Sequence, residues 1–235
     1  MSEVTAPLLK PRSDLGIRTI SGVVMMGIAI AAIWFGGYAF MALVLSVGLG
    51  VYWEFSRLVI GFTESRASRV AWLLGGLIYV GLACFTLLLF SAPFFGKIVT
   101  VILIAGVVGT DVGAYFFGKA IGGPKIAPKI SPSKTWSGLA GGMLGAGLLM
   151  IAAQKAFNLD YTFVYSPSFT LAAGAALAAV AQAGDFFESW MKRRAGVKDS
   201  GRLIPGHGGL FDRADGLIAV AFILGIISVG QMLFS

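Results

Sequence analysis

A short polar stretch interrupts an otherwise apolar chain: residues 197–216 read VKDSGRLIPGHGGLFDRADG. It gathers the only histidine of the chain, three aspartates, three basic residues and several glycines. Carboxylates without a cysteine or histidine cluster favour a hard cation that prefers oxygen ligands, which indicates magnesium rather than zinc. Basic side chains around such an ion suit a polyphosphate substrate, because phosphoryl and nucleotidyl transfer depend on positioning and charge stabilisation. The stretch therefore predicts metal-assisted chemistry on phosphate groups.

The ionisable residues of the chain are concentrated in two blocks, residues 111–138 and residues 185–215. Asp111 and Asp185 lie within apolar runs of these blocks. An ionised carboxylate at membrane depth costs at least about 2.5 kcal/mol, so it normally faces a cavity, a cation or a charged partner. Two interpretations are open for these aspartates: they serve a polar site, or they form buried structural ion pairs.

Helical spacing places several of these polar residues on common faces. At about 100° per residue, four polar side chains of the second block fall within one arc of a helix: Asp185, Glu188, Ser189 and Lys192. The opposite face of that helix is apolar. Asp111, Tyr115 and Gly118 are likewise spaced for one face of an earlier helix. Both patterns predict a helix whose polar stripe faces a site.

The composition that surrounds these blocks is that of a membrane protein: 57% of the residues are hydrophobic, 12% are charged, and the mean hydropathy is +0.86. A bilayer core requires about 20 apolar residues per helix, and a helix satisfies its own backbone hydrogen bonds there. We expect one all-α, polytopic catalytic domain over residues 1–235, with residues 1–17 preceding the first span. The seven expected spans are residues 18–35, 39–56, 70–90, 98–117, 138–155, 169–190 and 216–234.

The basic residues are unevenly divided between the two sides of this arrangement. Sixteen of the 18 fall on one side, and only Lys97 and Lys155 fall on the other. Loops rich in Lys and Arg stay in the cytoplasm, so the N-terminus and a polar cavity formed by the two blocks are expected to face the cytosol. The net charge of +7 is then explained without nucleic acid as a partner, and some basic side chains are expected to attract anionic membrane phospholipid.

Glycines occur in two patterns with different interpretations. Residues 138/142 and 141/145 form two GxxxG spacings, which are typical of close helix packing. Gly208 and Gly209 instead follow His207 outside any expected span. Their backbone N–H groups could approach an anion as in a phosphate-binding nest, and ordinary turn formation is the alternative.

The two blocks resemble the signature of the phosphatidate cytidylyltransferase family. In the second block, SWMKR at residues 189–193, Lys198-Asp199 and IPGHGGLFDRAD match the family pattern. The first block resembles another family motif, with DxxAYxxGKxxG followed by APxISPxKTxxG, and the region from RTISGVVMMGIAI to WEFSRL is similar to the first helix pair of the family. The resemblance covers nearly the whole chain. Ser137 departs from it, because the family pattern has glutamate there.

This resemblance implies that CTP and phosphatidate react to give CDP-diacylglycerol and pyrophosphate at a bacterial plasma (inner) membrane. It implies Mg²⁺ at Asp185 and Asp212, with Asp111 as a further metal or cytosine-site candidate, and it is compatible with a second cation such as K⁺ and with a homodimer. The expected catalytic residues are Asp185, Asp212, Lys192 and Lys198. The expected substrate-binding residues are Lys125, Lys134, Ser189, Arg193, Asp199, His207, Gly208, Gly209 and Arg213.

The charge of the lipid phosphate limits the roles that these residues need to play. A phosphate monoester has a second pKa near ~6, so phosphatidate is largely dianionic at neutral pH and its attack requires no general base. We therefore expect His207 to hydrogen-bond and order its loop rather than to transfer a proton. Two other functions stay open: a CTP-dependent polyprenol or phytol kinase, and a membrane transporter. The concentration of polar residues toward one side argues against a transport path.

Overall fold

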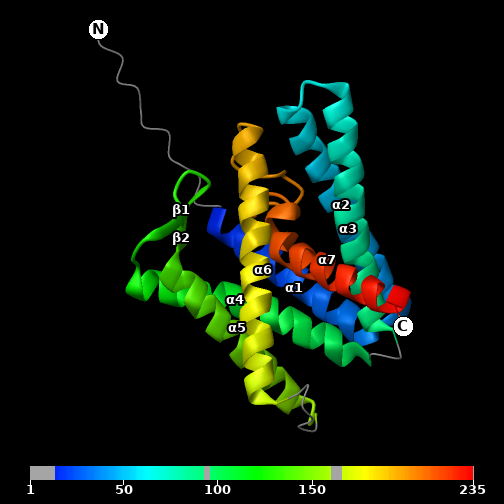
Figure 1. The fold of residues 1–235 in the computed structure, drawn as a ribbon, viewed down its shortest axis with the longest axis vertical. Coiled ribbons are helices and arrows are strands. Elements are labelled where there is room, and N and C mark those ends of the chain that lie inside the picture. The colour runs from blue at the N-terminus through cyan, green and yellow to red at the C-terminus, as the bar shows by residue number, and fades with distance from the viewer. Residues whose placement is uncertain (1–13, 93–95, 160–165, 235) are drawn as a thin grey trace.

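The apolar stretches of the sequence form helices in the computed structural model, which describes residues 14–92, 96–159 and 166–234 (Figure 1). Most of the expected N-terminal segment, residues 1–13, lies outside the described residues. The elements are α1 (Asp14–Phe35), α2 (Gly37–Phe62), α3 (Arg66–Ser91), α4 (Gly96–Ile121), β1 (Lys125–Ala127), β2 (Ser131–Thr135), α5 (Trp136–Ala156), α6 (Pro167–Arg194) and α7 (Phe211–Phe234).

The all-α, membrane-spanning architecture is confirmed. Within the described part of the chain, seven helices are each long and apolar enough to cross a bilayer. Every expected span lies inside one of these helices. The largest extensions are residues 57–62 at the end of α2 and residues 211–215 at the start of α7. The expected spans end at the first polar residues because they were drawn from hydropathy, whereas the hydrogen-bonded helices continue through those residues.

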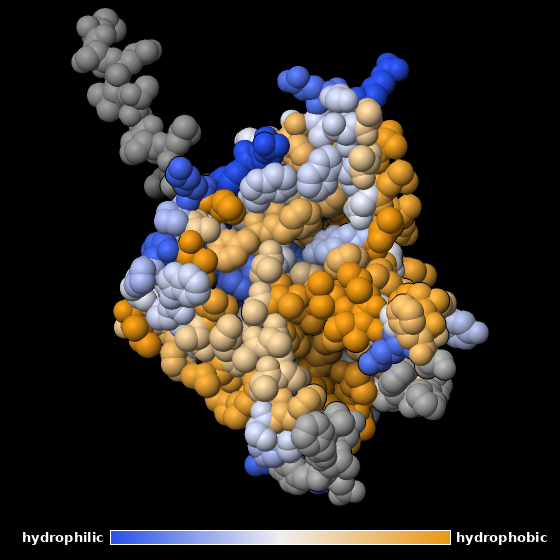
Figure 2. Space-filling view, in the orientation of Figure 1, coloured by the Kyte–Doolittle hydropathy of each residue, from blue (hydrophilic) through white to orange (hydrophobic). Residues whose placement is uncertain are grey.

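The helices leave the polar elements at one end of the molecule. In Figure 1 the β-hairpin, the α2–α3 turn and the loop between α6 and α7 all lie in the upper part of the view. Figure 2 shows hydrophilic residues gathered there and hydrophobic residues over the middle of the same face. The packing core includes Phe55, Met191 and Phe211, each at most 1% exposed, where α2, α6 and α7 meet.

Glycines allow α4 and α5 to pack backbone against backbone. A Cβ on Gly109 or Gly113 would collide with the carbonyl oxygen of Gly145 or Gly141, respectively. These contacts confirm close packing for the 141/145 spacing, and α4 and α5 form the most extensive helix pair. Because Asp111 lies on α4 and Gly138 lies on α5, this packing fixes the distance between the two ends of the first block.

A short antiparallel hairpin, which the sequence did not predict, connects α4 to α5. Lys125 on β1 lies opposite Thr135 on β2. The Thr135 hydroxyl then caps α5 by accepting a hydrogen bond from the backbone N–H of Gly138 at 3.0 Å. Ser137, at the position where the sequence signature has glutamate, donates its hydroxyl to the carbonyl of Gly122. The hairpin is thereby fixed at both ends and directs β2 toward α6.

Candidate active site

An ion pair between Lys134 and Asp185 joins the two sequence blocks. Lys134 lies on β2, Asp185 lies on α6, and each side chain is 26% exposed. The hydroxyl of Ser189, one turn further along α6, donates to Asp185 Oδ1 at 3.4 Å. Arg193 Nε donates to the carbonyl of Ile130 in the hairpin at 3.3 Å. Half of the polar stripe expected on this helix, Asp185 and Ser189, therefore faces the first block, whereas Glu188 and Lys192 face Asp212.

Asp185 contacts the Lys134 ammonium, and two further aspartates lie at a greater distance from it. Asp111 and Asp215 both lie within electrostatic range of Lys134 and of Asp185. Close packing brings α7 to this point, because a Cβ on Gly184 would lie 2.8 Å from the carbonyl oxygen of Asp215. Lys134 pairs directly with one of these carboxyl groups, and Arg213 also lies within electrostatic range of Asp111, so the cluster favours positive charge.

The chemistry of this cluster suits a hard cation, since its donor atoms are carboxylate oxygens. In the described parts of the chain, however, no three His, Cys, Asp or Glu side chains lie close enough to hold one ion together. The arrangement thus supplies the donor types that a metal site needs without a complete set of ligands.

Asp212 belongs to a neighbouring cluster rather than to the Lys134 pair. Its Oδ1 accepts from Lys192 Nζ at 2.6 Å, and its Oδ2 accepts from the backbone N–H groups of Ser200 and Gly209, both at 2.9 Å. Lys192 also forms an ion pair with Glu188, which is 1% exposed. The two aspartates expected to share a metal therefore each bind a different lysine here.

Glu54 organises the loop that leads into α7, and sequence reasoning missed it. Its side chain is completely buried. Its carboxylate accepts from the backbone N–H groups of Leu210 and Phe211, at 3.0 and 2.8 Å, and from the Ser200 hydroxyl at 2.8 Å. A carboxylate is favourable at a helix N-terminus, where backbone N–H groups lack helical partners. A lone glutamate in the apolar run of α2 was the available signal.

The glycines of the second block make room for this network. A Cβ on Gly201 or Gly209 would collide with the Glu54 carboxylate, and the Gly209 position would also collide with the Ser200 hydroxyl. Gly208 has φ of 86°, a conformation that favours glycine. The anions that bind the N–H groups of residues 209–211 in this structure are the carboxylates of Asp212 and Glu54.

His207 connects the loop to α1. Its Nδ1 lies 2.8 Å from the Ser21 hydroxyl, which also donates to the carbonyl of Pro205 at 3.0 Å. Arg213 donates to the His207 carbonyl at 2.9 Å. These contacts agree with the hydrogen-bonding role expected for His207.

The remaining predicted site residues lie near the loop and the hairpin. Lys198 and Asp199 have exposed side chains at the start of the loop, and Gly208 packs near the Asp199 side chain. Lys125 donates to the carbonyl of Ser133 at 3.4 Å within the hairpin. These cationic side chains are within the polar end of the molecule but are not part of the Lys134 cluster.

A cavity of about 350 Å³, called here the polar pocket, opens beside the Lys134 cluster. It lies between α4, β2, the start of α5 and α6. Asp111 and Lys134 border both the cluster and this pocket, so the two are continuous. The polar side chains that line it are Asp111, Tyr115, Lys119, Ser133, Lys134, Thr135 and Gln182.

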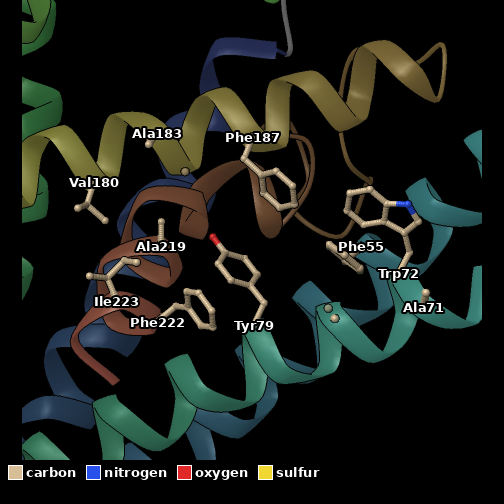
Figure 3. Close-up of a pocket in the computed structure, with 13 residues that line it drawn as sticks. Phe55, Ala71, Trp72, Tyr79, Val180, Ala183, Phe187, Ala219, Phe222 and Ile223 are labelled. Atoms are coloured by element: carbon tan, nitrogen blue, oxygen red, sulfur yellow. The ribbon is translucent and has the colours of Figure 1, made fainter. Parts of the chain in front are cut away.

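A second cavity of about 590 Å³, the apolar groove, lies between α3, α6 and α7 (Figure 3). Trp72 and Tyr79 of α3 line it together with Phe187 of α6 and Phe222 of α7. Figure 3 shows these rings arranged around one space, with the Tyr79 hydroxyl toward the α6–α7 side. Gly184 also lines this groove and packs against the backbone of Asp215, so the groove lies near the carboxylate cluster.

Fold and site together define an integral membrane protein whose polar site suits phosphate chemistry and adjoins an apolar groove. Residues 58–229 match the cytidylyltransferase family, and the chain belongs to that family. It is thus a nucleotidyltransferase. The chain is 37% identical to the phosphatidate cytidylyltransferase of Brucella suis, over 90% of this chain and 92% of the relative. It is 33% identical to that of Rickettsia felis, over 94% and 96% of the two chains.

Proposed function

We propose that this protein transfers the cytidylyl group of CTP to phosphatidate, giving CDP-diacylglycerol and pyrophosphate. The observation that carries the proposal is the Lys134–Asp185 pair, which joins both blocks beside a polar pocket, while an apolar groove lies on another side of the same helix. A soluble nucleotide and a membrane lipid require those two environments. Relatives named phosphatidate cytidylyltransferase that align with about nine-tenths or more of the chain support the same reaction.

The apolar groove suits an acyl chain of the lipid substrate. Its lining is aromatic and aliphatic apart from the Tyr79 hydroxyl and the Trp72 indole N–H, and Gly184 in its wall packs against the backbone of Asp215. Burial of apolar surface contributes about 25 cal/mol per Å², so apolar contact would hold an acyl chain in this groove.

The reaction itself requires charge balance rather than proton transfer. A dianionic phosphatidate oxygen attacks the α-phosphate of CTP, a new P–O bond forms, and the bond to the β-phosphate oxygen breaks as pyrophosphate leaves. The barrier includes repulsion between two anions, which nearby cations reduce. Lys134, Lys198 and Arg213 are the basic side chains that we assign to this role, because they lie in or beside the loop and cluster described above.

Asp185 and Asp212, with Asp111 as a further candidate, are the residues that would hold Mg²⁺, and Asp215 lies within electrostatic range of Asp185 and Asp111. The ion would offset charge on the nucleotide phosphates and on the leaving pyrophosphate. Lys134 provides the positive charge next to Asp185 in this structure, and the same ammonium suits a substrate phosphate. A second cation such as K⁺ and a homodimer are further predictions from the resemblance.

The bias of basic residues supports a site that faces the cytosol from a bacterial inner membrane, where CTP is present.

The test of the proposed function is an assay of the purified protein in detergent with phosphatidate and CTP labelled on either the α- or the γ-phosphate. Label from the α-phosphate in the lipid, with release of pyrophosphate and loss of activity on chelation of Mg²⁺, is expected. Transfer of the γ-label with release of CDP would identify a lipid kinase instead and overturn the proposal.

A further inference from the structure

Gln182 is a buried amide in the wall of the polar pocket. It lies on α6, is 6% exposed, and its Nε2 has no hydrogen-bond partner among the described residues. Gln154, buried to 5%, offers a direct contrast, since Thr170 binds both ends of its amide at 3.0 and 3.1 Å. A buried amide without a partner retains its desolvation cost, so the Gln182 donor indicates a ligand atom that accepts a hydrogen bond.

The other groups in this pocket are those that would hold a planar base. Asp111 is exposed into the pocket and offers only acceptors when ionised. Tyr115, one turn further along α4, is 60% exposed; the Lys119 ammonium lies over its ring, 5.5 Å from the centroid, which leaves the opposite face of the ring for a base to stack on. The cavity of about 350 Å³ is at the small end of the ~300–1,000 Å³ typical of small-molecule sites. It suits a base with its sugar rather than a lipid.

We propose that the polar pocket binds the cytosine base of the nucleotide, with Gln182 and Asp111 as its hydrogen-bonding partners. This inference rests on the proposed function. The edge of cytosine presents the N4 amino group as a donor and N3 and O2 as acceptors. A glutamine amide supplies one donor and one acceptor, and a carboxylate accepts from the N4 amino group of cytosine.

The two side chains contribute differently to specificity. An amide can turn by 180° and exchange its donor and acceptor, so Gln182 pairs equally well with cytosine or with uracil. The Asp111 carboxylate cannot make this exchange, and it would face the O4 acceptor of uracil without a proton between them. Gln182 therefore provides affinity for a pyrimidine, and Asp111 provides the preference for cytosine over uracil.

Direct binding of CTP and UTP to the purified protein in detergent with Mg²⁺, without lipid, tests this inference. Gln182→Leu is expected to weaken the binding of both nucleotides at least about 10-fold, because each loses both amide contacts. Asp111→Asn is expected to reduce the preference for CTP over UTP at least about 10-fold, since an asparagine can turn to donate to O4. Gln154→Leu, which removes an equally buried amide outside the pocket, should change both affinities less than about twofold.

Two results of these binding measurements would contradict the inference. CTP affinity that stays within twofold in Gln182→Leu would overturn the inference, and Gln182→Met replaces that variant if thermal unfolding shows that it does not fold. Equal loss of CTP and UTP binding in Asp111→Asn would assign Asp111 to the phosphates or the metal and overturn the specificity role. Because binding is measured without phosphatidate, a wild-type protein that prefers CTP but forms no CDP-diacylglycerol would contradict the proposed function and leave this inference standing.

Discussion

The polar pocket and the apolar groove lie on different sides of the same helix, α6. Gln182 lines the pocket, whereas Ala183 and Phe187 line the groove. With about 100° per residue, the two groove residues are rotated roughly 100° and 140° from Gln182. Asp185, which is paired with Lys134, is rotated about 60° from Gln182 and about 160° from both groove residues. One helix thus separates the polar pocket from the apolar groove, and its Asp185 carboxylate lies on the pocket side.

The largest expected effect is at the Lys134–Asp185 ion pair beside the polar pocket. Asp185→Asn should lower activity at least about 100-fold, because it removes charge where the phosphates meet. Its thermal stability in detergent should be close to that of wild type, since the asparagine loses only one partly exposed ion pair. Asp212→Asn should lose activity and stability together, because Asp212 also binds the backbone of Ser200 and Gly209.

Glu64→Gln is the control for this pair of variants, since Glu64 is exposed between α2 and α3. Its activity and its unfolding temperature should both match wild type. Substantial activity in purified Asp185→Asn would contradict the assignment of this aspartate to the proposed metal site.

A second expected effect concerns the loop that leads into α7. Glu54→Gln should lower the free energy of unfolding by about 2–3 kcal/mol, because a buried charged acceptor of three hydrogen bonds is replaced by an amide. Denaturation in detergent measures this change, and proteolysis within residues 197–210 should become faster. Unchanged stability would show that the loop does not depend on α2.

A third prediction fills the apolar groove without altering the polar pocket. Ala183 is exposed in the groove, so Ala183→Phe should fit without a collision and raise the KM for phosphatidate about 10-fold, with the KM for CTP unchanged. Ala172→Phe is a matched control, because it places the same ring at an exposed site on α6 about 16 Å away along the helix. Equal effects of the two variants would point to membrane insertion rather than to the groove.

The smallest expected effect is at the contact between α1 and the loop. Ser21→Ala removes the hydrogen bonds to His207 and Pro205 and should lower stability by about 1 kcal/mol. Activity should stay within a few-fold of wild type, measured at saturating concentrations of both substrates. A loss as large as that of Asp185→Asn would instead give His207 a direct part in the reaction.

The sequence predicted those features that depend on local pattern. The seven spans follow from hydropathy, the polar stripe at Asp185 and Ser189 follows from helical period, and the close packing of α5 follows from glycine spacing, although its partner α4 does not. Each of these is a property of one helix or one pair of neighbouring helices.

Features that depend on distant partners were not predictable in this way. The hairpin is two short strands among prolines, which reads as a loop, and the pairing of Lys134 with Asp185 requires the fold. Glu54 acts on backbone groups that a sequence pattern does not display. Gln182 did leave a signal, because it is a polar residue in an alanine-rich run one turn before Asp185.

The most direct test of the two-sided arrangement measures the KM for CTP and the KM for phosphatidate in the same two variants. Gln182→Leu should raise only the KM for CTP, and Ala183→Phe should raise only the KM for phosphatidate, although the two residues are adjacent on α6. A variant that raises both constants equally, or a reversal of the two effects, would contradict the separation of nucleotide and lipid by this helix.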